Sequence, residues 1–223
     1  MSTRIYIADT SGLQNSEIFE RILSYMPQNR KERIKKFKFL ADKERSLAAG
    51  ELLRRACIDF EIPGADRALT ENEYGKRGFV ANTDVFFNLS HSGQRAVCII
   101  SDRECGADVE KVKDVNLKVS ARSFTKKEHD YIENAGSTEE MQSRFFRLWT
   151  LKESYMKATG FGFKLFPNMF SIDIEKNPAS LQTSSYDGNY SFFEISRDDG
   201  YKYSFCEKGE EFDSDVEIIY VDF

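Results

Sequence analysis

Two short segments of the sequence carry acidic residues at spacings that can do chemistry. Asp108 and Glu110 lie two positions apart among apolar neighbours, so a strand would point both carboxylates to one face. Glu153 and Lys157 lie four positions apart, one turn from each other on a helix. If this strand packs against this helix, three carboxylates and an ammonium can converge. Such oxygen ligands favour Mg²⁺, which substrate phosphates usually complete.

Each segment also has a simpler explanation, which we favour for either segment alone. An Asp-x-Glu pair is common on exposed strands, and a Glu/Lys pair at this spacing usually lies on a solvated helix face. A third segment, Phe86–Gly93, changes that balance. It predicts a strand over residues 85–89, followed by a polar turn with Ser90, His91 and Ser92, which are hydrogen-bond donors suited to a phosphate. For this turn taken alone, we favour the simpler interpretation that its Ser and Asn side chains cap backbone groups and that His91 is exposed.

Together, the three segments resemble the 4′-phosphopantetheinyl transferases, specifically the longer, two-lobed type that activates surfactin synthetase (the Sfp type). The matching segments are Asn-Leu-Ser-His-Ser-Gly at 88–93, Gly-Ala-Asp-Val-Glu at 106–110 and Trp-Thr-Leu-Lys-Glu-Ser-Tyr-Met-Lys at 149–157, with Glu-Tyr-Gly-Lys at 73–76 upstream. Their order and spacing match, and the similarity runs from about Pro27 to Phe170. The joint match is specific, whereas a single motif would not be.

The resemblance implies an enzyme that moves the 4′-phosphopantetheine arm of coenzyme A to a serine of an apo carrier protein. The reaction would depend on Mg²⁺ and release adenosine 3′,5′-bisphosphate. The implied metal ligands are Asp108, Glu110 and Glu153. The implied catalytic residues are Glu153, Lys157 and His91, with Lys157 and His91 at the pyrophosphate. Glu153 would also serve as the base for the serine, directly or through water.

The resemblance further implies where coenzyme A binds. A basic run at residues 30–38 would, on its own, be interpreted as a solvated helix face. In the family this region binds the 3′-phosphate of coenzyme A. The implied binding residues are Arg30, Arg33, Arg45, Ser46, Gly75, Lys76, Ser90, His91 and Lys157. Glu128 resembles a further family acid near the metal, and Trp149 is interpreted as core packing.

Composition agrees with an ordinary globular protein of 223 residues, with 40% hydrophobic and 31% charged residues. The net charge of −5 argues against general nucleic-acid binding. We expect no membrane segment, since no apolar run approaches about 18 residues, and no signal peptide. Only two histidines are present, which excludes a His-rich metal centre, and the four cysteines show no C-x-x-C spacing. We therefore expect a cytoplasmic monomer.

The pattern of helices and strands predicts an α+β fold, because the two kinds of element segregate rather than alternate. We expect the pseudo-twofold, two-lobed architecture of the family, with each lobe a small antiparallel sheet packed on a long helix. The lobes would be residues 1–104 and 105–223, with the metal site in the second and the ligand cleft between them. The predicted strands are 3–8, 85–89, 96–100, 105–110, 170–174, 190–195, 201–205 and 216–221, with a short strand and turn at 70–76. The predicted helices are 16–26, 27–39, 41–60 (the longest), 115–123, 126–133 and 139–159.

Two other functional classes stay open at this point. A different Mg²⁺-dependent enzyme, such as a nucleotide phosphohydrolase, would need no serine-bearing partner. A coenzyme-A-binding module without turnover would not need all three acids. The sequence also leaves open whether the carrier belongs to fatty-acid, polyketide or nonribosomal peptide synthesis, and whether acyl-coenzyme A is accepted.

Overall fold

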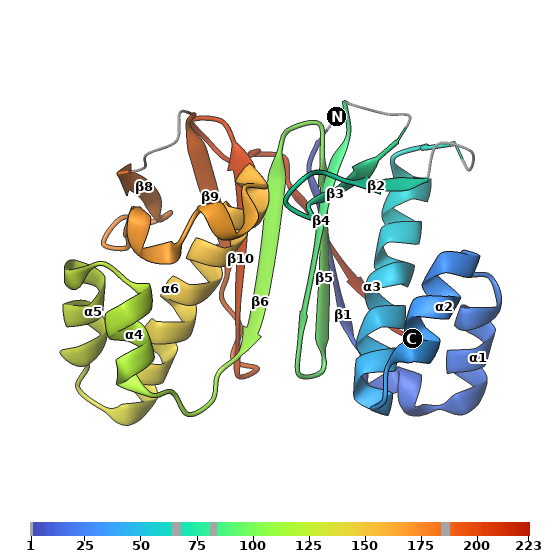
Figure 1. The fold of residues 1–223 in the computed structure, drawn as a ribbon, viewed down its shortest axis with the longest axis horizontal. Coiled ribbons are helices and arrows are strands. Elements are labelled where there is room, and N and C mark those ends of the chain that lie inside the picture. Colours follow the sequence, from blue (N-terminus) through green and yellow to red (C-terminus); the bar gives the residue numbers. More distant parts are fainter. Residues whose placement is uncertain (1, 64–67, 81–83, 184–187) are drawn as a thin grey trace.

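The computed structural model describes residues 2–63, 68–80, 84–183 and 188–223. Its helices gather on two opposite sides, and most of its strands lie between them (Figure 1). The α+β class with two lobes is therefore confirmed. One lobe is centred on α3 (Leu40–Asp59) and the other on α6 (Thr138–Thr159).

The first lobe contains a four-stranded sheet in the order β11-β1-β5-β4. Its strands are β1 (Arg4–Asp9), β4 (Phe86–Ser92), β5 (Arg95–Ser101) and β11 (Glu217–Val221). Its other elements are η1 (Ser11–Gln14), α1 (Ser16–Ser24), α2 (Gln28–Lys36) and a separate hairpin of β2 (Leu69–Glu71) and β3 (Arg77–Phe79). Strands β1 and β5 are buried on both faces: Tyr6 and Cys98 pack toward α3, whereas Ile7 and Val97 pack toward the other lobe.

The second lobe contains a five-stranded sheet in the order β6-β10-β9-β8-β7. Its strands are β6 (Cys105–Lys111), β7 (Ser171–Asp173), β8 (Ser180–Thr183), β9 (Tyr190–Ile195) and β10 (Tyr201–Lys208). Its other elements are α4 (Leu117–Ser123), α5 (Lys126–Glu133), α6, η3 (Gly162–Lys164) and η4 (Pro167–Met169). Ser137 caps the start of α6, since its side chain accepts a hydrogen bond from the backbone N–H of Glu140, and Gly160, in the left-handed conformation, caps its end.

The two lobes are joined by an apolar layer and by a polar seam. In the layer, Ile7 and Val97 of the first lobe pack in one cluster with Val109 and Phe205 of the second. At the seam, polar side chains of β4 accept hydrogen bonds from backbone N–H groups of β6. The donor–acceptor pairs are Ala107 N to Asn88 Oδ1 (3.1 Å), Val109 N to Ser90 Oγ (3.4 Å) and Lys111 N to Ser92 Oγ (3.2 Å). Side chains thus take the place of a backbone ladder and fix the register between the lobes.

Strand β4 differs from its prediction in where it ends. It runs through Ser92, because His91 pairs with Ala96 and Ser92 pairs with Arg95 on β5. The turn is confined to Gly93 and Gln94, and Gly93 has the positive φ of 55° that such a tight turn requires. The predicted polar turn is therefore wrong. Because alternate residues of a strand face opposite sides, His91 points away from its two serine neighbours.

Three further features also differ from the sequence-based expectations. The longest described helix is α6, with 22 residues against 20 for α3. Strand β8 was not anticipated, since its sequence is largely polar. The last strand, β11, returns to the first lobe and pairs in parallel with β1, so that sheet is not purely antiparallel. The division at residue 104 stays a prediction, with β11 as an exception to it.

Candidate active site

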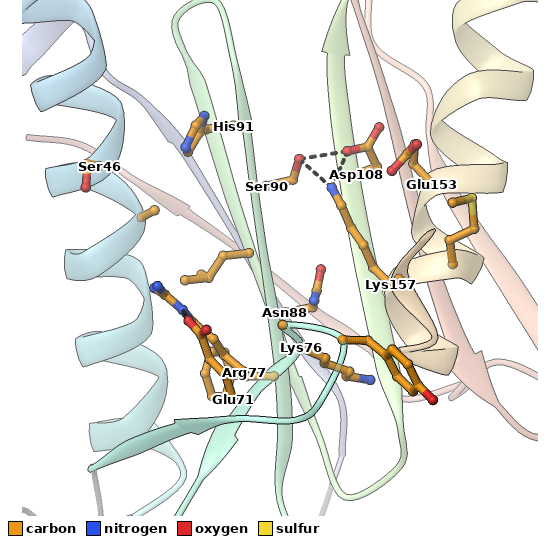
Figure 2. A pocket seen from close by; sticks show the side chains of 18 of the residues that line it. Ser46, Glu71, Lys76, Arg77, Asn88, Ser90, His91, Asp108, Glu153 and Lys157 are labelled. Atoms are coloured by element: carbon orange, nitrogen blue, oxygen red, sulfur yellow. Dashed lines mark hydrogen bonds and ion pairs between the residues drawn. The ribbon is translucent and has the colours of Figure 1, made fainter. Parts of the chain in front are cut away.

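A cavity of about 810 Å³ lies between the two long helices, with β4, β6 and the β2–β3 hairpin among its walls (Figure 2). Most of the residues singled out by the sequence line it. They are Arg30, Arg33, Ser46, Gly75, Lys76, Ser90, His91, Asp108, Glu110, Glu153 and Lys157. The three sequence segments that suggested chemistry therefore meet in one place.

Arg45 is the predicted binding residue that the cavity lining does not include, as far as the described residues show. Its guanidinium forms an ion pair with Asp42 and donates a hydrogen bond to the carbonyl oxygen of Gly93 at 3.1 Å. Its role in coenzyme A binding stays a prediction.

Asp108 is the centre of the polar network in the cavity and is only 3% exposed. Its Oδ1 accepts hydrogen bonds from Lys157 Nζ at 2.6 Å and from Ser90 Oγ at 2.8 Å (Figure 2). Lys157 Nζ also donates to Ser90 Oγ and to the carbonyl of Ala107, both at 3.2 Å. Oδ2 of Asp108 is buried and has no hydrogen-bond partner within the described part of the chain. A buried carboxylate oxygen without a partner is costly, which makes it a natural ligand atom.

Glu110 and Glu153 lie near Asp108 and feel its charge. Burial and the negative charge of Asp108 raise the pKa of Glu110, although a hydrogen bond from Ser92 Oγ at 2.6 Å opposes the shift. Burial, together with Asp108 and Glu110, raises the pKa of Glu153, and Lys157 opposes that shift. Burial is the leading cause of both shifts, and the negative charges of the neighbouring carboxylates add to it.

These acids have the chemistry of a magnesium site without forming a finished cage. Among the described residues, no group of three ligating side chains has the geometry of a preformed metal site. At Asp108, one of the two carboxylate oxygens is already paired with the ammonium of Lys157, which leaves only the other for a metal. The oxygen-only donor set, the unpartnered Oδ2 of Asp108 and the raised pKa values of the two glutamates nevertheless fit a hard divalent cation. The set fits a cation that shares its coordination with substrate and water.

Gly106 explains why the acidic strand and the acidic helix come so close. A Cβ at this position would lie 2.0 Å from the carbonyl oxygen of Ser154 and 2.4 Å from the backbone nitrogen of Ala158. Both atoms belong to α6, so the helix backbone rests directly on β6. Glu153 and Lys157 are thereby brought beside Asp108. The glycine that precedes the acidic pair is a packing requirement of the site.

The opposite side of the cavity is positively charged. His91 points toward α3, on the other face of β4 from Ser90 (Figure 2). Partial desolvation lowers the pKa of His91, with further contributions from Arg45, Lys157 and Arg33. Ser46, on α3, is 3% exposed, and its hydroxyl has no hydrogen-bond partner among the described residues. This end of the cavity offers cationic and neutral donors to an anion.

The hairpin residue Lys76 has a contact that the sequence did not suggest. Its Nζ donates to the carbonyl oxygens of Ala158 at 2.5 Å and Cys105 at 3.3 Å, in the other lobe. Burial lowers the pKa of this lysine. The Asn72 side chain donates to Gly160 O at 3.1 Å, so the hairpin is fastened to the end of α6. The predicted place of Lys76 along the nucleotide stays a prediction, with its ammonium already engaged.

Glu128 lies away from the metal acids that the resemblance placed it near, whereas Trp149 packs with core residues as predicted. Glu128 is 2% exposed, pairs with Lys152 Nζ at 2.8 Å and accepts from Ile172 N at 3.0 Å. It is not among the described residues that line the cavity, so it braces α5 against α6 rather than joining the other acids. Trp149 stacks on Phe145 as expected of a core residue, yet it also lines the cavity.

Comparisons with known proteins agree with the site. A family model described as "4'-phosphopantetheinyl transferase superfamily" matches residues 104–206. A second model, "4'-phosphopantetheinyl transferase, N-terminal", matches residues 14–103. The 4′-phosphopantetheinyl transferase gsp of Aneurinibacillus migulanus is 30% identical over 190 residues, which cover 85% of this chain and 79% of that protein. The chain belongs to the 4′-phosphopantetheinyl transferase superfamily.

Other members of the superfamily are similar to this chain over differing lengths. The 4′-phosphopantetheinyl transferase Sfp of Bacillus subtilis is 29% identical over 205 residues, covering 90% of each chain. The L-aminoadipate-semialdehyde dehydrogenase-phosphopantetheinyl transferase of Xenopus laevis is 30% identical over 167 residues, covering 68% of this chain and 54% of that protein. The predicted membership of the Sfp type, and the prediction that the protein is a phosphopantetheinyl transferase enzyme, are confirmed. Within the described ranges, no helix combines the length and apolarity needed to span a bilayer.

Proposed function

We propose that this protein transfers the 4′-phosphopantetheine arm of coenzyme A to a serine of an apo carrier protein, with Mg²⁺, and releases adenosine 3′,5′-bisphosphate. The observation that carries the proposal is the polarity of one cavity. Asp108 and Glu153 lie on its acidic side, while Arg30 and Arg33 lie on its basic side. An acidic, metal-compatible site beside a basic pocket suits a substrate with a pyrophosphate and a separate phosphate.

The proposed metal ligands are Asp108, Glu110 and Glu153. When bound there, Mg²⁺ would neutralise the charge of the pyrophosphate and of the leaving group. Lys157 donates to Asp108 in the free protein. With the substrate bound, it would donate to a phosphate oxygen as well, at the expense of part of that contact. Ser90 holds Asp108 through its hydrogen bond at 2.8 Å, and Ser92 holds Glu110 at 2.6 Å. The acids are therefore oriented by the opposite lobe before any ligand arrives.

The chain would also bind and orient the nucleotide part of coenzyme A. Arg30 and Arg33 would hold the 3′-phosphate, with the unpartnered hydroxyl of Ser46 as an additional donor. Gly75, at φ 86°, forms the exposed tip of the hairpin and leaves its backbone open to the nucleotide. His91 projects between these groups and the pyrophosphate side.

Glu153 is the proposed base for the serine of the carrier. In the metal-free protein, burial raises the pKa of this carboxyl group, so it holds a proton more tightly than an ordinary glutamate. It would take the serine proton directly or through one water. The attack of the serine oxygen on the β-phosphorus then breaks the bond to the bridging oxygen, which leaves on adenosine 3′,5′-bisphosphate. We further propose that the protein acts as a monomer, because one chain supplies both sides of the cavity. We also propose that it is cytoplasmic.

A labelling assay tests this function. The protein is incubated with fluorescent coenzyme A, Mg²⁺ and a panel of apo carriers from fatty-acid, polyketide and peptide synthesis, and each carrier is also tested with its serine replaced by alanine. We expect label on at least one serine-bearing carrier, none on the alanine variants, and none after chelation of the metal. Release of adenosine 3′,5′-bisphosphate without a carrier would instead indicate a phosphohydrolase. Tight binding of coenzyme A with no label on any carrier would indicate a binding module.

A further inference from the structure

A third arginine stands beside the two that are proposed to bind the 3′-phosphate. Arg77 begins β3 and lines the same cavity as Arg30 and Arg33. All three also line a neighbouring cavity of about 710 Å³, so their side chains form the wall that the two cavities share. Figure 2 shows Arg77 with Glu71 on the α3 side of the site. The sequence motifs gave no reason to single out Arg77.

The charges of this wall are not balanced. In the described part of the chain, no carboxylate lies within ion-pair distance of Arg30 or Arg33, and Arg30 donates only to the carbonyl of Ser46 at 3.3 Å. Glu71 pairs with Arg77, Nε to Oε1, at 2.9 Å. Burial and then the charge of Arg77 lower the pKa of Arg30 to about 10, and the same causes lower the pKa of Arg33. Three guanidinium groups thus face one carboxylate, which leaves two positive charges for a ligand to neutralise.

We propose that Arg77 is a further binding residue for the terminal phosphate of coenzyme A, and that Glu71 holds it in the free protein and yields it to the phosphate. This inference rests on the proposed function. The pair is loosely held, because the Arg77 and Glu71 side chains are 32% and 55% exposed. A phosphate dianion beside two more arginines is a better partner for a guanidinium than one exposed carboxylate. Glu71 itself lines the cavity, so it also repels the ligand.

Two single variants separate this role from a purely structural one. Arg77→Ala removes a phosphate donor, whereas Glu71→Gln frees the guanidinium and removes the repulsive charge. We therefore expect opposite effects: Arg77→Ala weakens coenzyme A binding about 10- to 100-fold, and Glu71→Gln strengthens it. If the pair only braced the hairpin, both variants would change binding in the same direction.

Isothermal titration calorimetry with coenzyme A and with dephospho-coenzyme A measures these effects. Dephospho-coenzyme A lacks the terminal phosphate, so we expect its affinity to change less than about threefold in either variant. Arg197→Ala, which removes the same charge from a half-exposed arginine in the other lobe, is the matched control and should leave both affinities unchanged. Circular dichroism and thermal melts confirm that each variant is folded.

The outcomes are distinct. Coenzyme A affinity that is unchanged in Arg77→Ala overturns the inference and leaves the proposed function standing. An equal loss of affinity for both ligands, or a change of coenzyme A affinity in the same direction in both variants, likewise overturns the inference. Either result assigns the Arg77–Glu71 pair to the fold of the hairpin. If the unaltered protein binds neither ligand, the proposed function itself fails.

Discussion

The hydroxyl of Ser90 on β4 donates to Asp108 Oδ1 on β6 at 2.8 Å, and so connects the two lobes at the central acid of the proposed metal site. The same hydroxyl oxygen accepts from the backbone N–H of Val109 and from Lys157. One small side chain therefore orients a carboxylate, a strand and a lysine together.

Asp108→Ala should abolish Mg²⁺-dependent transfer while leaving the protein folded. Among the three proposed metal ligands this carboxylate is the most buried, and its unpartnered oxygen is the best-placed ligand atom for the metal. We expect at least about a 100-fold loss of kcat/KM, measured by carrier labelling. Asp173→Ala, on β7 and outside the cavity, is the matched control and should retain activity. Near-normal turnover of folded Asp108→Ala would remove this strand from the metal site.

Glu153→Gln distinguishes a metal ligand from a base. The amide keeps the size and one oxygen of the carboxylate but loses its charge and its basicity. If Glu153 is only a ligand, high Mg²⁺ should restore much of the rate. If it is also the base, saturating Mg²⁺ restores coenzyme A binding while kcat stays low by a factor on the order of 10²–10⁴. A glutamate on an ordinary solvated helix face would give near-normal activity at every Mg²⁺ concentration.

The raised pKa of Glu153 predicts an opposition between stability and activity. A carboxyl group whose pKa is higher in the folded than in the unfolded state destabilises the fold when ionised. That destabilisation is present above the raised folded value and is relieved as the pH falls through it toward the ordinary value of 4.5. In the absence of Mg²⁺, Glu153→Gln should therefore melt at a higher temperature than the unaltered protein at pH 7. The two melting temperatures should converge near pH 4.5.

The measurement is the difference between the two melting temperatures as a function of pH, which cancels the titration of groups that do not interact with Glu153. Adding Mg²⁺ at pH 7 should raise the melting temperature of the unaltered protein more than that of the variant. A difference that does not change with pH would show that burial of Glu153 carries no such cost.

Gly106→Ala should damage the site through packing alone. The new methyl group would meet the backbone of α6 at Ser154 and Ala158, so the helix must move away from β6. Overpacking of this kind costs about 1–3 kcal/mol in the free energy of unfolding, or more where only backbone can yield. Because Glu153 and Lys157 move with the helix, kcat should fall as well. Gly78→Ala, where a Cβ meets nothing within 4 Å, is the control and should behave like the unaltered protein.

The exposed start of α5 is a candidate docking surface for the carrier. Lys126 and Lys127 are exposed and follow the acidic strand in the same lobe. Carriers of this kind are often acidic near the modified serine, so reversal of both lysines to Glu should raise KM for the carrier and leave KM for coenzyme A unchanged. The matched control reverses two exposed lysines outside the cavity lining, Lys176 and Lys208. A carrier KM that keeps its value and its salt dependence would remove α5 from the docking surface.

The acidic half of the site was predictable because it needs only local periodicity. Asp108 and Glu110 follow from the period of a strand, and Glu153 and Lys157 follow from the period of a helix. Gly106 lies where β6 contacts α6, but the need for a glycine there is evident only once the α6 backbone is seen to pack against it. The side chains that share one face of a strand or helix are set by its period, and tertiary packing leaves that assignment unchanged.

The remainder depends on contacts between distant segments, which periodicity does not encode. Ser90 was assigned to a turn, but pairing with β5 extends the strand and decides which way it faces. Lys76 carries the same charge whether it binds a phosphate or the end of α6, and only the packed hairpin distinguishes the two. Arg77 belongs to no motif. Its proposed role in phosphate binding rests on its position beside Arg30 and Arg33, which precede it by more than forty residues.

The parallel pairing of β1 with β11 sets the order in which this protein can be completed. Arg4 and Glu217 meet at the edge of the first sheet although they are 213 positions apart. During synthesis, β1 emerges before β11, so this edge of β1 must wait unpaired until all the residues between the two strands have been made. An open strand edge is a site for aggregation, and such distant contacts slow folding. Expression of the first lobe alone should therefore yield a poorly soluble fragment, and a peptide that supplies residues 217–221 should improve its recovery.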